Sequence, residues 1–154
     1  TEKKKARIDL GYVGDIVRRD QGVISSELER HKVAVVLPMG LGPDGKGYNV
    51  NADEAASHIA AALGAEKLVL LTNVKGIMRN PDDPASFISA INIKEARELM
   101  RDKVIQQGMI PKVDACIEAL VSGVKKTHII DARIPHGLLL EIFTDQGVGT
   151  EINH

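Results

Sequence analysis

A chain of 154 residues suits one domain with a single core, and aliphatic side chains must fill it because aromatic residues make up only 3%. The 20 Lys and Arg residues against 21 Asp and Glu leave a net charge of −1, which excludes an overall field for nucleic acid or an anionic membrane. The single cysteine, Cys116, excludes an internal disulfide framework, and no apolar run approaches the roughly 18 residues of a membrane-spanning helix.

The first element expected along the chain is a buried strand at residues 33–39, because the run VAVVLPM is continuously apolar. The glycine-rich stretch 40–47 follows and fits both the dinucleotide-binding and the P-loop glycine patterns. A P-loop, however, needs Ser or Thr after its lysine and a helix that begins there, whereas Gly47 and a strand-like segment follow Lys46. We therefore interpret residues 40–47 as a hairpin or flap.

A helix is expected next, at about residues 52–63. Asn51 can cap its start and Gly64 can end it. The apolar run 67–72 predicts a second buried strand. Residues 79–86 are rich in Pro and Asp, which predicts a surface excursion.

Two further helices are expected in the second half of the chain. One covers about residues 93–101, where Asn92 and Glu95 have the spacing of a capping box. The other covers about residues 111–122, where Pro111 suits the first turn of a helix. The second stretch also has an apolar stripe at helical spacing, at Val113, Ile117 and Leu120.

The chain is expected to finish with a buried strand at 127–131, a helix at about 137–143 and a short strand near 150–152. Strands that alternate with helices imply crossover connections, so the sequence predicts an α/β fold with a mainly parallel sheet covered on both faces. We see no linker and expect residues 1–154 to form a single domain. In such sheets ligands bind beyond the carboxyl ends of the strands.

Polar residues alternate just before the helix expected at 52–63. Residues two apart in an extended segment share a face, so Asn49 and Asn51 point the same way, and Asp53 follows in the first helical turn. Asn51 is explained as an ordinary cap, and Asp53 as a carboxylate that the helix dipole stabilises. Asn49 has no such structural explanation, which makes it a candidate binding residue.

A lysine stands in the first turn of the helix expected at 111–122. Lys112 lies there beside the positive end of the helix dipole, which costs about 0.3–1 kcal/mol unless an anion is present. Lys112 is therefore a candidate for binding phosphate, although a lysine that points into water gives the same pattern. The loop LTNVKG after the strand 67–72 is placed to meet a nucleotide, and a plain turn is equally compatible with it.

Four blocks of sequence together resemble the carboxyl-terminal half of acetylglutamate kinase, a member of the amino acid kinase superfamily. The blocks are YNVNADEAA, AALGAEKLVLLTNVKGI, GMIPKVDA and IPHGLLLEIFTDQGVGT, and the match runs from about Asp9 to Ile152. The resemblance implies a three-layer α/β/α sandwich of the carbamate kinase-like type, with the amino-terminal half of that fold absent from this chain. It also implies ATP-dependent phosphorylation of the side-chain carboxylate of N-acetyl-L-glutamate in arginine biosynthesis, with magnesium carried by the ATP.

The resemblance also implies roles for individual residues. The first Asn of the N-x-N-A-D motif, here Asn49, would contact the acetylamino acid, and the Asp, here Asp53, would organise catalytic lysines. The Lys of G-M-x-P-K, here Lys112, would neutralise charge on the transferring phosphoryl group. No metal ligand is expected from the protein itself. Nucleotide contacts are expected from two stretches: Asn73, Val74, Lys75, Gly76, Ile77 and Met78, and then Val104, Ile105 and Gln106.

The chain departs from that family in two ways. The family's other half carries a further catalytic lysine, glycine-rich phosphate loops and most of the acetylglutamate pocket, and Asn73 stands where the family often has Asp. We therefore expect this chain to be inactive alone and to be part of an active, homo-oligomeric, cytoplasmic parent. Because the first residue is Thr1 rather than Met, we also expect that something precedes it in the natural protein.

Two alternatives stay open. The chain could be a regulatory module that senses L-arginine, since four residues match the segment that binds arginine in feedback-inhibited members: His136, Glu141, Gly147 and Gly149. Residues 138–140 could equally be plain core and the glycines a turn. The other alternative is a sibling kinase that shares the fold but phosphorylates carbamate, aspartate, glutamate or a nucleoside monophosphate.

Overall fold

The computed structural model describes residues 11–17, 20–80, 82–144 and 147–154. Its main sheet has the strand order β3 (Lys67–Thr72), β5 (Lys126–Asp131), β6 (Thr150–Asn153) and β4 (Ala90–Asn92). β3 pairs with β5 and β4 with β6 in parallel, while β5 and β6 are antiparallel. The predicted α/β class with a mainly parallel sheet is confirmed.

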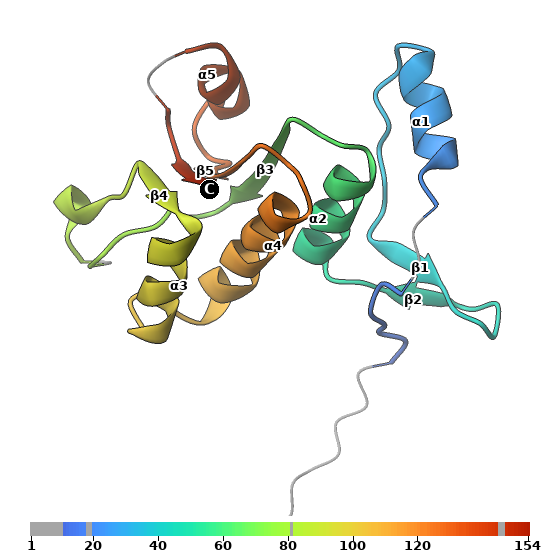
Figure 1. The fold of residues 1–154 in the computed structure, drawn as a ribbon, viewed down its shortest axis with the longest axis horizontal. Coiled ribbons are helices and arrows are strands. Elements are labelled where there is room, and N and C mark those ends of the chain that lie inside the picture. Colours follow the sequence, from blue (N-terminus) through green and yellow to red (C-terminus); the bar gives the residue numbers. More distant parts are fainter. Residues whose placement is uncertain (1–10, 18–19, 81, 145–146) are drawn as a thin grey trace, which may run out of the picture.

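Helices cover both faces of this sheet. α2 (Ala52–Ala62), α3 (Ile93–Arg101) and α4 (Ile110–Val121) lie on one face, and α5 (Gly137–Phe143) lies on the other (Figure 1). The molecule therefore has the three-layer α/β/α arrangement. The helices α2 and α4 pack side by side, and α4 also contacts three of the four strands. α4 is consequently the best buried helix, with six buried residues on its inner side.

The core lies between the sheet and the helices α2, α3 and α4. α4 supplies more of its members than any other element, and Leu70, Ile91, Ile129 and Ile152 extend it across the four strands. Aliphatic side chains fill it, as the composition requires, because burying apolar surface is the main favourable contribution to folding. Its side chains that are at most 2% exposed are Ile77, Ala96, Val113, Cys116, Ala119, Leu120, Val124, Ile129 and Ile152.

The helices α2 and α3 begin where the sequence has capping residues. The side chain of Asn51 accepts hydrogen bonds from the amides of Asp53 and Glu54, 2.9 and 3.2 Å away. Asn92 and Glu95 form the predicted capping box at the start of α3. Two short 3₁₀ helices, η1 (Pro84–Ser86) and η2 (Gln107–Met109), complete the connections, and η1 lies in the predicted surface excursion. η2 leads directly into α4.

The strand predicted at residues 33–39 is wrong. Only Met39 belongs to a strand, β1 (Met39–Leu41), which pairs with β2 (Gly47–Asn49) in a separate two-stranded sheet. Val33 and Val35 are each 90% exposed. An apolar run becomes a buried strand only when a neighbouring strand pairs with it and helices cover it, and no strand among the described residues pairs with residues 33–38. The predicted hairpin at 40–47 is confirmed, because β1 and β2 form it.

The helix α1 (Gly22–Glu29) was not predicted. Gln21 precedes it without a side-chain cap, and none of its residues is buried. The strand β4 was also missed, because its three residues run directly into α3. Among the described helices, none is long and apolar enough to cross a lipid bilayer.

Candidate functional site

The first candidate pair, Lys112 and Asp53, forms an ion pair between two helix starts. Lys112 Nζ lies 2.8 Å from Asp53 Oδ2 and 3.1 Å from Oδ1, although the residues are 59 positions apart in the sequence. Asp53 is in the first turn of α2 and Lys112 in the first turn of α4, and these helices pack side by side (Figure 1). The structure therefore brings the two predicted residues into direct contact.

This pairing explains how the fold tolerates a lysine at the start of a helix. The dipole of α4 repels the ammonium, but the carboxylate of Asp53 supplies the opposite charge, and Asp53 is itself favoured at the start of α2. The two side chains are 23% and 19% exposed, so they remain within reach of a ligand. A cation thus stands, partly buried, beside two helix N-termini whose amides also favour anions.

Asn49 and Asn51 have different surroundings. Asn51 is occupied as the cap of α2, and this fixes the turn that carries Asp53. Asn49 ends β2, and its side chain is exposed. Its backbone amide donates to the carbonyl of Tyr12 at 2.8 Å, and its carbonyl accepts from the amide of Gly14 at 3.0 Å. The backbone of Asn49 is therefore anchored, while its side chain faces solvent.

The two stretches expected to hold a nucleotide line one cavity. The cavity measures about 270 Å³ and lies where the loop after β3 meets the segment between α3 and η2. Its walls are mostly apolar side chains, and Met109, which the sequence did not indicate, completes them. Asn73 and Lys75 do not line it. The lining residues are Val74, Gly76, Ile77, Met78, Val104, Ile105, Gln106 and Met109.

The cavity and the ion pair share an element. Met109 lines the cavity and is the residue before α4, while Lys112 is the third residue of that helix. Lys112 therefore lies one helical turn from the cavity wall. A ligand whose apolar end fills the cavity could reach the ammonium of Lys112 with an anionic end.

An ordered ion pair stands at the carboxyl ends of β3 and β5. Asp131 ends β5 beside Thr72, the last residue of β3. Its Oδ1 accepts hydrogen bonds from the backbone amide and Nε of Arg133, at 3.0 and 2.9 Å, and its Oδ2 accepts from Nη2 at 2.7 Å. These bonds hold the pKa of Asp131 at about 2, and the nearby charge of Lys75 acts in the same direction. The loop that carries Lys75 is thus next to a fixed charge.

The fold brings only some of the four residues matched to the arginine-binding segment close to one another. Glu141 is buried, and its Oε2 accepts a hydrogen bond of 2.7 Å from the amide of Val148. The histidine that contacts it is His128, whose Nδ1 lies 2.6 Å from Glu141 Oε1, and not His136. His128 was missed because the run 127–131 read as an ordinary buried strand.

The other three residues of that set differ in accessibility. His136 is exposed at the turn before α5, with a φ of 58°. Gly147 lies close to the carboxylate of Glu141, and Gly149 is buried against the backbone of Ile129, where a side chain would overlap the Ile129 carbonyl. In the structure the carboxylate of Glu141 is therefore engaged by its own chain.

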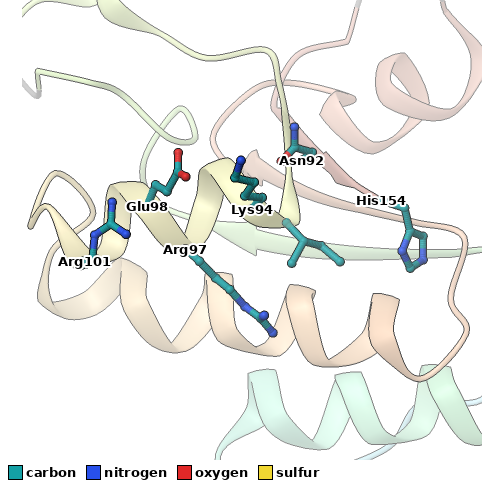
Figure 2. Close-up of a pocket in the computed structure, with 7 residues that line it drawn as sticks. Asn92, Lys94, Arg97, Glu98, Arg101 and His154 are labelled. Carbon is teal, nitrogen blue, oxygen red and sulfur yellow. The ribbon is translucent and has the colours of Figure 1, made fainter.

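A larger cavity, of about 550 Å³, lies elsewhere, along α3. Lys94, Arg97, Arg101 and the chain end at His154 line it. Figure 2 shows Arg97 extending to the side opposite Lys94 and Arg101, so these cations do not converge on one point. None of the predicted site residues lies there. Among the described residues no group of three or more His, Cys, Asp or Glu side chains is placed to hold a metal ion.

Comparison with known proteins assigns the chain to a family. The sequence pattern of the amino acid kinase family matches residues 1–131. The chain belongs to the amino acid kinase family. The resemblance noted from the four blocks is thereby confirmed at the level of the family.

Relatives within the amino acid kinase family include acetylglutamate kinases. That of Moorella thermoacetica is 54% identical over 145 residues, which cover 94% of this chain and 49% of that protein. That of Thermoanaerobacter pseudethanolicus is 52% identical over 151 residues, which cover 98% of this chain and 50% of that protein. The chain therefore spans about half the length of the curated relatives it matches.

Solved structures agree with this family assignment. N-acetylglutamate synthase from Neisseria gonorrhoeae, complexed with coenzyme A and L-arginine, matches with a TM-score of 0.85 and 30% identity, over 95% of this chain and 33% of that chain. Carbamate kinase from Giardia lamblia matches with a TM-score of 0.68 and 24% identity, over 86% of this chain and 43% of that chain. The second likeness is one of fold alone.

Proposed function

We propose that this chain is the ATP-binding part of an acetylglutamate kinase, whose parent enzyme phosphorylates the side-chain carboxylate of N-acetyl-L-glutamate. The observation that carries the proposal is the contact between Lys112 and Asp53, one helical turn from a cavity lined by both expected nucleotide stretches. The relatives that are about half identical over nearly the whole chain support the choice of substrate.

The proposed reaction needs charge neutralisation more than acid–base chemistry. An oxygen of the substrate carboxylate attacks the γ-phosphorus of ATP, the bond from that phosphorus to the β–γ bridging oxygen breaks, and ADP leaves with the electron pair. A carboxylate is already a nucleophile, so no proton has to move. The ammonium of Lys112 would neutralise charge on the phosphoryl oxygens, and Asp53 would hold that ammonium in place as a fixed counter-charge.

The cavity fits one end of a nucleotide. Ligand cavities in proteins are commonly about 300–1,000 Å³ and mostly apolar, and this one, at about 270 Å³, suits a nucleobase rather than a whole nucleotide. The exposed Val74 and the buried Ile77 and Ile105 contribute to an apolar lining for the base. The phosphates would then lie toward the start of α4, and magnesium would be carried by them.

The acceptor site is the part of the proposal that this chain supplies least. Asn49 has an exposed side chain on an anchored backbone, which suits a contact with the acetylamino acid. The rest of that pocket is proposed to come from the other half of the parent enzyme, so the chain alone is proposed to bind ATP without turning it over. We also place the parent in the cytoplasm, which agrees with a single cysteine, Cys116, that is free and buried.

Calorimetric titration of this chain with ATP and magnesium tests the proposal. We expect binding, and we expect Lys112→Ala to weaken it about tenfold, because a charge-assisted contact with phosphate is lost. Adenosine should bind the wild type and Lys112→Ala equally, since the cavity is unchanged. Lys125→Ala is the matched control, because Lys125 also forms an ion pair, with the exposed Glu66, but lies outside the site.

The same titration separates the kinase from a second candidate, an arginine-sensing module. That candidate is favoured by the likeness to the synthase complexed with L-arginine, and by the closeness of Gly147 to Glu141. If L-arginine binds and ATP does not, arginine sensing replaces ATP binding as the function of this chain. If neither ATP nor adenosine binds at millimolar concentration, the proposed function is wrong.

A further inference from the structure

The hydroxyl group of Thr150 joins three distant parts of the chain. Thr150 is the first residue of β6 and is completely buried. Its Oγ1 accepts a hydrogen bond of 2.9 Å from the backbone amide of Ile77, and it donates one of 2.6 Å to the carbonyl of Ile88. These partners are 73 and 62 positions away in the sequence. A single hydroxyl therefore ties the sheet to both ends of the segment 77–88.

One of those ends forms a wall of the cavity. Ile77 and Met78 line it, and they are paired with the returning segment through the bond from the Ile88 amide to the Ile77 carbonyl and the bridge between Met78 and Phe87. The amide of Ile77 faces the opposite way, toward Thr150. The hydroxyl thus completes the hydrogen bonding of the backbone at the cavity wall.

The neighbouring glycine shows how tightly this contact is packed. Gly76 has a φ of 132°, and a Cβ added there would come within 2.6 Å of Thr150 Oγ1. A side chain at this position would push the loop away from Thr150, in a backbone conformation that L residues rarely adopt. The close approach of Gly76 and the hydroxyl of Thr150 together define where the wall lies.

We propose that Thr150 is a positioning residue for the nucleotide cavity, acting through the Ile77 amide without touching the ligand. The choice of ATP as the ligand rests on the proposed function, whereas the effect of Thr150 on the cavity wall does not. Without the hydroxyl, the buried amide of Ile77 and the carbonyl of Ile88 would each lose a partner, and the wall would move to satisfy them. The base would then meet a displaced surface.

A merely structural role for a buried threonine can be separated from this one. Thr127 is equally buried in the neighbouring strand β5, and its hydroxyl donates to the carbonyl of Ile152 at 3.2 Å. It does not line the cavity or bond to a residue that does. Thr127→Val therefore removes a buried hydroxyl from the same sheet and serves as the matched control for Thr150→Val. Thr150→Ser keeps the hydroxyl and serves as the rescue.

The experiment has two readouts on the wild type and these three variants. The first is hydrogen exchange of individual amides in the chain without ligand. We expect Thr150→Val to accelerate exchange of the Ile77 amide at least tenfold, and Thr150→Ser and Thr127→Val to leave it near the wild-type rate. The second is the affinity for ATP with magnesium, which we expect to fall about tenfold in Thr150→Val alone.

The outcomes decide the inference in every case. Unchanged exchange at Ile77 in Thr150→Val overturns it, and so does faster exchange with an unchanged ATP affinity. Equal losses in Thr150→Val and Thr127→Val also overturn it, because they would show a general loss of stability. If the wild type binds no ATP, the proposed function fails, and the exchange of Ile77 alone then decides whether Thr150 positions the cavity wall.

Discussion

The ammonium of Lys112 lies where a helix ordinarily favours a carboxylate. The fold offsets this with Asp53, which stands at the start of the adjacent helix and reaches Lys112 Nζ at 2.8 Å. Both side chains are partly exposed, so an anionic ligand can reach the pair. This arrangement suits a cation that must be held in place before its ligand arrives.

The contact between Asp131 and Arg133 predicts a dependence of stability on pH. The pKa of Asp131 is lowered from 3.8 to about 2, chiefly by the hydrogen bonds from the Arg133 side chain. A carboxyl group whose pKa is lower in the folded state than in the unfolded state stabilises the folded state fully at pH values above its unfolded-state pKa. This contribution is lost as the pH falls toward the folded-state pKa. We therefore expect the difference in melting temperature between wild type and Asp131→Asn to be constant above about pH 5 and to shrink steadily toward pH 2.

Thermal unfolding followed by circular dichroism between pH 2 and 7 measures this difference. Asp114→Asn is a suitable control, since Asp114 is an exposed carboxylate on α4. A difference that stays constant down to pH 2 would show that the ion pair does not stabilise the folded state.

At the scale of elements, the capping box at the start of α3 carries a prediction of stability. The Asn92 side chain accepts from the Glu95 amide at 2.9 Å, and the Asn92 amide donates to Glu95 Oε2 at 3.1 Å. Asn92→Ala should lower the free energy of unfolding by about 1 kcal/mol, and Asn92→Ser should retain most of the stability that the cap contributes. Urea denaturation measures both, and an unchanged midpoint in Asn92→Ala would contradict the role of the cap.

Elements set by local chemistry were predictable from the sequence, and elements set by distant neighbours were not. α2 and α3 begin at their predicted residues, because the caps Asn51 and Asn92 act over one turn. α4 has no side-chain cap and begins one residue before its predicted start at Pro111. The run at 33–39 was predicted wrongly, because burial depends on which strands and helices surround it. α1 gave no signal, since Gln21 makes no side-chain cap.

The candidate site divides in the same way. The helix dipole pointed to Lys112, and the place of residues 71–76 after a buried strand pointed to a nucleotide loop. The resemblance added the role of Asp53 and the stretch 104–106. The sequence alone could not indicate Met109 or Thr150. Met109 closes a cavity between segments that are distant in the chain, and Thr150 bonds to Ile77 across 73 positions. Their contributions exist only once the chain has folded.

Taken as a whole, the molecule exposes apolar side chains near its amino-terminal end. Val33, Val35, Leu37 and Leu41 are each more than two-thirds exposed. Contiguous exposed apolar residues commonly mark surfaces that another part of a protein covers. Together with a length about half that of its relatives, this agrees with the proposal that the chain supplies one part of a larger cleft.

ATP is proposed to bind across the cavity and the start of α4. NMR mapping of the backbone amide shifts during titration with ATP and magnesium tests this proposal. We expect the affected amides to belong to both stretches, 74–78 and 104–106, and to the first turn of α4 around Lys112. Shifts confined to the basic cavity along α3, at Lys94, Arg97 and Arg101, with both stretches unchanged, would contradict it.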